Sequence, residues 1–326
     1  FSFKSCSFCV NLSADRQVCV QLHFYKMDLI INLNKPKGIT SHQATTEVKK
    51  IFKAKKAGHA GTLDPSATGV LLVCLNKATR LASYFSSLGK EYKAVMKLGE
   101  TTDTQDADGT VICKKDKIEV DAHLIKNTLR FFEGEILQKP PIFSALKYKG
   151  KPLYKYAKRG IEITIEPRKI FIRHIELLNI DIPFVGFRVI CSKGTYVRTL
   201  CNDIGEKLGV GAHLFELERT AIGQFSVSDS LSIEKLKSID TEHLPQTGIY
   251  SMDSALSWMP EMKINESLIR VVKNGNPLEI SKCHGFSDDL KTAAGIKIKS
   301  PDGEFLALGS FSAEKNAVKM DIVFIA

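Results

Sequence analysis

The sequence predicts an α+β protein in which helices flank a mixed, largely antiparallel sheet, followed by a small β-rich C-terminal domain. Strand-like and helix-like segments are intermixed along the chain, without the strict alternation of parallel α/β folds. No repeat of 20 to 50 residues recurs, which excludes a solenoid. With 326 residues and 44% apolar content, the chain is long enough for one large and one smaller domain.

The large domain is expected to begin near Met27. The stretch MDLIINLNKPKGITS combines an apolar strand, a Lys-Pro-Lys-Gly turn and a capping residue, Thr40 or Ser41, before a helix over 41–53. The apolar run at 69–75 is a strand by its length. The elements expected next are a helix over 76–85, an alternating strand over 91–99 and a helix over 119–134 that Gly134 closes.

The later part of the large domain follows the same mixed pattern. Strands are predicted over 167–180 and 187–194, and a helix over 195–209 with Thr195 near its cap and Gly209 past its end. A boundary is expected around 245–262, so that the large domain covers 27–256. The remainder, 257–326, is predicted to alternate in short strands around Asn-Gly-Asn and Pro-Asp-Gly turns, including the stretch KINESLIRVVKNGNPLEI.

Residues 1–26 differ from the rest of the chain. They contain no methionine, and Lys4, Asp15 and Arg16 interrupt any apolar core of a signal peptide. We expect a non-native or disordered extension with no part in the fold. Its single C-x-x-C, Cys6 and Cys9, is weak evidence for zinc because Cys19 or His23 would have to fold back as further ligands, so no metal is expected.

The composition narrows the range of partners. The net charge of +10 is spread along the chain, which suits a folded nucleic-acid-binding protein, although charge alone does not decide this. No apolar stretch approaches the ~18 residues of a membrane span. The eight cysteines are scattered, as expected for reduced thiols of a cytoplasmic protein. Motifs for nucleotide phosphates, dinucleotides, zinc proteases and serine hydrolases are missing, so no cofactor is predicted.

The glycine-rich stretch GHAGTLDPSATGVL draws attention to Asp64. By itself, an Asp-Pro pair is typical of a helix N-cap followed by proline at the first helical position. Three further motifs are LNKPKGITS (33–41), GKEYKAVMKLGETTDTQDADG (89–109) and CSKGTYVRTLCNDIGEKLGVGAHLFELERT (191–220). Together the four motifs resemble the TruB family of tRNA pseudouridine synthases, in the family's order, from residue 29 to about 256.

The resemblance implies a function. The chain would have the pseudouridine synthase fold with a PUA-like C-terminal domain, and it would isomerise uridine 55 in the T loop of tRNA without a cofactor. Asp64, which lies in the family's G-x-L-D-P motif, would be the catalytic aspartate, and Arg198 would pair with it; the alternative for Arg198 is a surface position on a helix. The related dyskerin enzymes lack the insertion that 119–165 resembles, so a stand-alone bacterial-type enzyme, acting as a monomer, is expected.

Further substrate-binding residues follow from the same motifs. Tyr92 would stack on the target base, Tyr196 would contact the substrate, and Leu217 would form an apolar wall. His59 would enter the RNA stack at the place of the flipped base, and Lys35 would lie near the active site. The alternatives are ordinary packing for the tyrosines, a core or loop position for the histidine and a structural turn for the lysine.

Two other functions are compatible with part of the sequence. A non-catalytic RNA-binding or tRNA-folding protein of the same fold would keep the basic surface without needing Asp64. A glycoside hydrolase would need two facing carboxylates. No second acid stands in a comparable motif, because Asp103, Asp106 and Asp108 are expected in a solvated turn.

Overall fold

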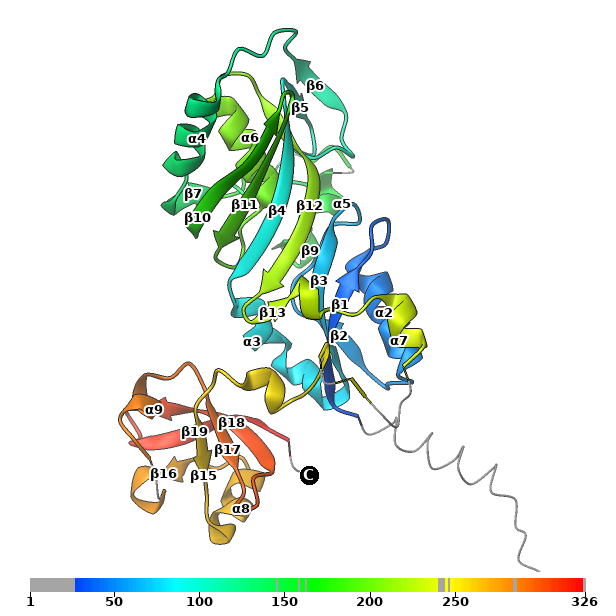
Figure 1. The fold of residues 1–326 in the computed structure, drawn as a ribbon. Coiled ribbons are helices and arrows are strands. Elements are labelled where there is room, and N and C mark those ends of the chain that lie inside the picture. Colours follow the sequence, from blue (N-terminus) through cyan, green and yellow to red (C-terminus); the bar gives the residue numbers. More distant parts are fainter. Residues whose placement is uncertain are drawn as a thin grey trace, which may run out of the picture.

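The computed structural model describes residues 27–324, except 145, 158, 162, 240–243, 246 and 284–285 (Figure 1). The proposed extension and its Cys6–Cys9 pair therefore lie outside the described residues. In the described part, helices cover a large mixed sheet and a second, smaller sheet follows, which confirms the predicted α+β class. None of the described helices has the length and apolar character needed to cross a membrane.

The large sheet has ten strands, eight of them in the order β14-β1-β3-β12-β4-β11-β10-β7, with β2 on β3 and β13 on β12. All pairs are antiparallel except β3 with β12. The strands are β1 (Leu29–Lys35), β2 (Ala57–His59), β3 (Thr68–Leu75), β4 (Lys90–Leu98), β7 (Gly134–Gln138), β10 (Arg168–Asp181), β11 (Phe184–Cys191), β12 (Ala212–Ile222), β13 (Phe225–Ser226) and β14 (Ile249–Ser251).

Helix α2 (Ser41–Ile51) begins where the sequence predicts. Thr40 and Gln43 form a reciprocal capping box, which satisfies two backbone donors at the helix start. Ala44 and Val48 are buried against β1 and β3, where α7 (Ile233–Lys237) joins the same apolar cluster. These two helices lie together beside β1 and β3 (Figure 1).

Helices α4 (Ala122–Phe131) and α6 (Val197–Lys207) cover the other half of the sheet, over β4, β10 and β11. Helix α6 packs closely on β12 through Gly205. A Cβ atom there would lie 2.1 Å from the backbone nitrogen of Ala212, so only glycine fits. This close packing fixes α6, whose first residues carry part of the candidate site.

Smaller elements connect these layers. They are α3 (Ala82–Ser87), α5 (Leu153–Ala157), the 3₁₀ turns η1 (Asn76–Leu81), η2 (Val227–Asp229) and η3 (Ser254–Leu256), and the short ladders β5 (Glu100–Thr102) with β6 (Val111–Lys114) and β8 (Lys147–Tyr148) with β9 (Lys151–Pro152). The single helix predicted over 76–85 is therefore a 3₁₀ segment followed by a short α-helix.

The C-terminal sheet has the order β15-β17-β18-β19-β16 and its own apolar core. Its elements are β15 (Glu261–Lys263), α8 (Glu266–Lys273), β16 (Leu278–Glu279), η4 (Ile280–Lys282), α9 (Asp289–Thr292), β17 (Ile296–Lys299), β18 (Phe305–Ser312) and β19 (Ala317–Val323). The strand pattern predicted within 263–280 was wrong over α8, which is helical.

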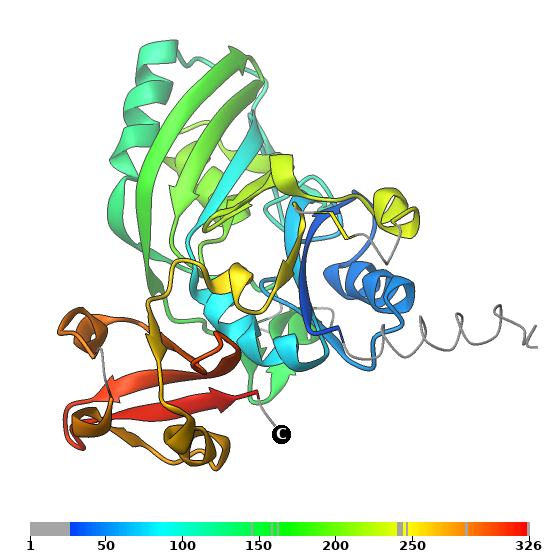
Figure 2. The same cartoon turned by 60° about the horizontal axis from the view of Figure 1, so that its bottom comes forward.

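The two sheets are joined by polar contacts. Asp253, just after β14, receives hydrogen bonds from Lys297 and ion-pairs with Lys299, both on β17. Lys77 in η1 donates to the Phe324 carbonyl at 2.8 Å. Figure 2 shows the C-terminal sheet beside η1 and α3. The boundary between residues 256 and 257 remains a prediction.

Candidate active site

Asp64 lies in the loop between β2 and β3, at one end of a pocket of about 280 Å³. The Ala67 N–H donates to the Asp64 carbonyl at 3.1 Å, which closes a β-turn directly before β3. No helix follows, so the interpretation of Asp-Pro as a helix N-cap was wrong. The Asp64 side chain remains 43% exposed, which leaves its carboxylate open to a ligand.

Contacts from distant parts of the chain hold the Asp64 loop. The Ser41 hydroxyl donates to the Leu63 carbonyl and accepts from the Leu63 N–H, at 2.9 and 2.8 Å. The Gly38 N–H donates to the Pro65 carbonyl at 2.8 Å. The residues on both sides of Asp64 are thus fixed by the turn before α2 and by the start of that helix.

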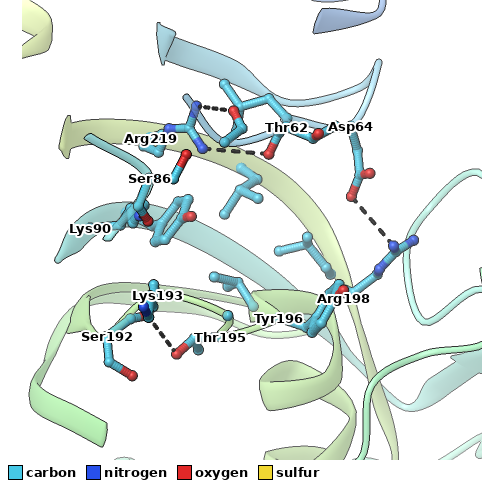
Figure 3. A pocket seen from close by; sticks show the side chains of 17 residues that line it. Thr62, Asp64, Ser86, Lys90, Ser192, Lys193, Thr195, Tyr196, Arg198 and Arg219 are labelled. Atoms are coloured by element: carbon cyan, nitrogen blue, oxygen red, sulfur yellow. Dashed lines mark hydrogen bonds and ion pairs between the residues drawn. The ribbon is translucent and has the colours of Figure 1, made fainter. Parts of the chain in front are cut away.

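Arg219 on β12 binds backbone carbonyls of the same loop. Its guanidinium donates to the carbonyls of Val70, Gly61 and Thr62, at 2.7, 3.0 and 3.4 Å. Figure 3 shows Arg219 beside Thr62. The residue is 1% exposed and also lines the pocket. Buried cations need such saturation with acceptors, so Arg219 organises the loop while it adds positive charge to the pocket.

Arg198, in the first turn of α6, connects two carboxylates. Its Nη1 donates to Asp106 Oδ2 at 3.1 Å, and its Nη2 lies 3.7 Å from Asp64 Oδ2. Figure 3 shows Asp64 and Arg198 facing each other across one end of the pocket. The Arg198 side chain is 8% exposed, so the alternative of a surface arginine was wrong.

Asp106 is one of the site residues that the sequence did not predict. It was expected in a solvated turn, but it is 8% exposed, because the loop docks on β12 through a hydrogen bond from the Leu214 N–H to the Gln105 carbonyl. Asp106 also accepts from the Thr104 hydroxyl at 2.6 Å. One oxygen of the Asp106 carboxylate therefore accepts from Thr104 and the other accepts from Arg198.

The charges around Asp64 act in opposite directions. Burial raises the pKa of the Asp64 carboxyl above its ordinary value, Arg198 opposes that increase, and the like charges of Asp106 and Asp108 add to it. The Arg198–Asp106 contact is shorter than the Arg198–Asp64 contact. Arg198 thus gives Asp64 a positive neighbour without fully neutralising it.

The pocket beyond Asp64 has aromatic and apolar walls. Tyr92 on β4, Tyr196 before α6, and Leu214 and Leu217 on β12 line it. Tyr92 is 8% exposed; burial raises the pKa of its phenol, and the charge of Arg219 opposes this rise. The arrangement suits a flat, largely apolar ring with polar edges.

The far end of the pocket is basic. Lys90 is 7% exposed and donates to the Ser86 and Leu88 carbonyls, at 2.6 and 2.7 Å. Burial lowers its pKa to about 8, and the Arg219 charge acts in the same direction. Lys193, in the loop after β11, lines the same end. Sequence reasoning assigned neither lysine to the site.

Two expected site residues lie outside the pocket lining. Lys35 is fully buried and donates to the Pro36, Ile39 and Pro65 carbonyls, at 2.8, 2.8 and 3.4 Å. Burial lowers its pKa to about 8, and the charge of Asp64 opposes this change. Lys35 therefore connects the turn before α2 to the Asp64 loop, and its role in the reaction remains a prediction.

His59 lies at the end of β2, paired with Val73 of β3. Its Nδ1 is buried and finds no hydrogen-bond partner among the described residues. Burial lowers the pKa of the His59 imidazole, and the charges of Arg219 and His42 lower it further. Over the described part of the chain, no group of three His, Cys, Asp or Glu side chains is placed to hold a metal ion.

Comparisons with known proteins identify the family of the chain. A family model for the N-terminal domain of TruB family pseudouridylate synthases matches residues 49–197, and one for the tRNA pseudouridylate synthase B C-terminal domain matches residues 198–257. The chain is 42% identical over 288 residues to tRNA pseudouridine synthase B of Clostridium tetani, covering 88% of this chain and 97% of that protein. It is 43% identical over 249 residues to the protein of the same name from Syntrophus aciditrophicus, covering 76% and 80%.

Solved structures show the same likeness. A chain of a Cbf5–Nop10–Gar1 complex is 31% identical with a TM-score of 0.70, covering 94% of this chain and 87% of that one. A chain of an H/ACA RNP bound to a substrate RNA containing 2′-deoxyuridine is 28% identical with a TM-score of 0.69, over the same shares. The fold that carries the pocket is therefore shared with a chain of an RNP that is bound to RNA.

Proposed function

Because the chain belongs to the TruB family of tRNA pseudouridine synthases, we propose that it isomerises uridine 55 in the T loop of tRNA and that Asp64 is its catalytic carboxylate. One observation supports this most directly: the open carboxylate of Asp64 lies between a buried arginine and a pocket lined by two tyrosines. A non-catalytic RNA-binding protein would not need a carboxylate held in this way.

The reaction fits the residues present. The bond between N1 of uracil and C1′ of the ribose breaks, the base turns, and C5 forms the new bond to C1′. The proton on C5 is then lost and N1 takes up a proton, so that the product is an isomer of uridine. Nothing is oxidised and no water is consumed. Asp64 acts as the nucleophile toward the nucleoside, and Arg198 keeps a positive charge beside it so that the carboxylate stays ionised at neutral pH.

A uridine in a folded loop must leave its stack to reach Asp64. Tyr92, Tyr196 and Leu217 then provide the faces that hold the flipped base, with Tyr92 stacking on it and accepting or relaying the C5 proton. His59, outside the pocket, contacts the RNA at the place that the base has left. Lys35 positions the Asp64 loop through the Pro65 carbonyl.

The partner is the T stem-loop of tRNA, bound by the net positive charge of the chain and by a PUA-like domain over 257–326. The solved relatives include complexes with other proteins. For this chain we propose a monomer that needs no partner protein, no cofactor and no metal, acting on tRNA in the cytoplasm.

The test is release of tritium from C5-labelled uridine in a T stem-loop transcript, followed by mapping of the modified position. Isomerisation at uridine 55 by the purified chain alone is the expected result. Tight binding of the transcript with no release of label would support the non-catalytic alternative, and release from another uridine would refute the site assignment.

A further inference from the structure

The side chain of Gln138, the last residue of β7, binds the backbone of Tyr196 with both of its polar atoms. Its Nε2 donates to the Tyr196 carbonyl at 3.0 Å, and its Oε1 accepts from the Tyr196 N–H at 2.8 Å. Gln138 is 2% exposed, and Tyr196 is 58 residues away in the sequence. Such a two-way contact holds the peptide groups on both sides of the Tyr196 Cα and so fixes the position and orientation of this residue's backbone.

The backbone N–H and carbonyl of Tyr196 both have hydrogen-bond partners as a result of this contact. Its carbonyl also accepts the Leu200 N–H at 3.0 Å, in the first turn of α6. Tyr196 is the N-cap residue of α6, and its side chain makes no capping hydrogen bond. Gln138 therefore fixes the start of the helix from outside, and Tyr196 is left to meet a ligand through its ring.

The chain that follows Gln138 also holds Arg198. The Phe143 carbonyl accepts from Arg198 Nη2 at 2.7 Å, the same nitrogen that faces Asp64. Residues 138–143 thus contact both pocket residues at the start of α6, one through its backbone and the other through its guanidinium. A shift of this segment would move Tyr196 and Arg198 together, relative to Asp64.

We propose that Gln138 is a positioning residue for the isomerisation, which sets where the Tyr196 ring and the Arg198 guanidinium stand relative to Asp64. The inference rests on the proposed function. Reactions held in a near-attack geometry are sensitive to displacements on the order of 1 Å, so loss of the contact should lower the rate of the chemical step more than the affinity for RNA.

Gln138→Glu tests this because a protonated glutamic acid has the same shape and hydrogen-bonding pattern as glutamine. The protonated carboxyl can donate to the Tyr196 carbonyl, whereas the carboxylate would repel it. The ordinary pKa of glutamate is about 4.3, and burial raises it. The charged groups on the neighbouring elements are Arg168, opposite on β10, and Arg198 on α6, and their positive charges oppose this increase.

The measurement is the single-turnover rate of the variant divided by that of the wild type, from pH 5.5 to 8.5, with the RNA dissociation constant taken at each pH. We expect a ratio within about threefold of one at the acid end and a loss of about tenfold to a hundredfold at the alkaline end. The dissociation constant should change by less than about threefold.

Gln43→Glu is the matched control. Gln43 also binds a backbone group, but only as an acceptor from the Thr40 N–H, so a carboxylate there keeps the bond and changes the net charge equally. Its rate ratio should stay near one at every pH. Gln138→Met, which cannot ionise, should be slow at all pH values, and it supplies the test if the glutamate variant does not fold.

Two results in the rates would overturn the inference: a Gln138→Glu ratio that stays near one across the whole pH range, or a wild-type rate in Gln138→Met. A loss that appears in RNA affinity and leaves the single-turnover rate unchanged would also overturn it. If the wild type is active, any of these three results refutes only the role of Gln138. A wild type that isomerises no uridine refutes the proposed function.

Discussion

Asp106→Asn is the sharpest test of how the candidate site works, because Asp106 binds different partners with its two oxygens. Oδ2 receives Arg198 Nη1 at 3.1 Å, while Oδ1 accepts from the Thr104 hydroxyl at 2.6 Å and from the Asp108 N–H at 3.2 Å. An asparagine can satisfy only one side. In either orientation, its NH₂ group faces another donor.

The magnitude follows from the lost contact. A hydrogen bond between charged groups contributes about 1.5–3 kcal/mol, which corresponds to a rate loss of about tenfold to a hundredfold if Arg198 no longer stands correctly beside Asp64. Removing one partner of a buried ion pair also lowers the free energy of unfolding, by up to about 3–5 kcal/mol. The RNA dissociation constant should change little, because Asp106 does not line the pocket between Asp64 and Lys90.

The pH profile adds a second readout. The Asp106 carboxylate raises the pKa of Asp64, so its removal should lower that pKa and shift the acid limb of the rate profile to lower pH. Tritium release under single-turnover conditions measures the rates. Asp108→Asn, an exposed position in the same loop, is the control for the rate at neutral pH because its charge change is equal. Its carboxylate also raises the pKa of Asp64, so the acid limb of this variant should shift too, without the rate loss. Equal rates for Asp106→Asn and wild type, or an equal loss in the control, would refute the reasoning.

Three further outcomes are expected. Asp64→Asn should abolish turnover and leave RNA affinity within a few fold. Because the pKa of Asp64 in the folded protein is raised above 3.8, ionisation of this carboxyl lowers the free energy of unfolding as the pH rises through that pKa. Asparagine cannot ionise, so the variant should melt at an equal or higher temperature than the wild type at pH 7. Tyr92→Phe should still bind the transcript but lose roughly 10² to 10⁴-fold in single-turnover rate if its hydroxyl takes part in proton transfer, and a wild-type rate would leave it only a stacking role. Affinity for tRNA, measured by filter binding, should fall steeply between low and moderate salt, and a flat salt dependence would speak against phosphate contacts.

Much of the fold was predictable because it depends on local patterns. The capping box at Thr40 and the alternation in β4 are local signals, and the structure has the corresponding helix and strand. Within α8 the local pattern was ambiguous. Leu268, Ile269, Val271 and Val272 satisfy a buried strand as well as a helix, and tertiary packing decided for the helix.

The candidate site divides in the same way. Asp64 and Arg198 were identified through motifs, but the partners of Arg198 were not, because Asp106 and the Phe143 carbonyl lie 92 and 55 residues away. Asp106 looks solvated in the sequence, since its neighbours are polar. It is buried because the loop docks on β12, and no short-range pattern records that contact.

The hydrogen bonds from Arg219 to the Asp64 loop have a consequence for folding during synthesis. Residues 61–62 are translated early, but Arg219, which binds their carbonyls, is translated with β12, more than 150 residues later. A nascent chain that ends before β12 therefore carries Asp64 without the carbonyl acceptors of its loop being bound by Arg219. Catalytic competence should appear late on the ribosome, only after β12 has inserted between β3 and β4, so that partly translated chains do not engage tRNA productively.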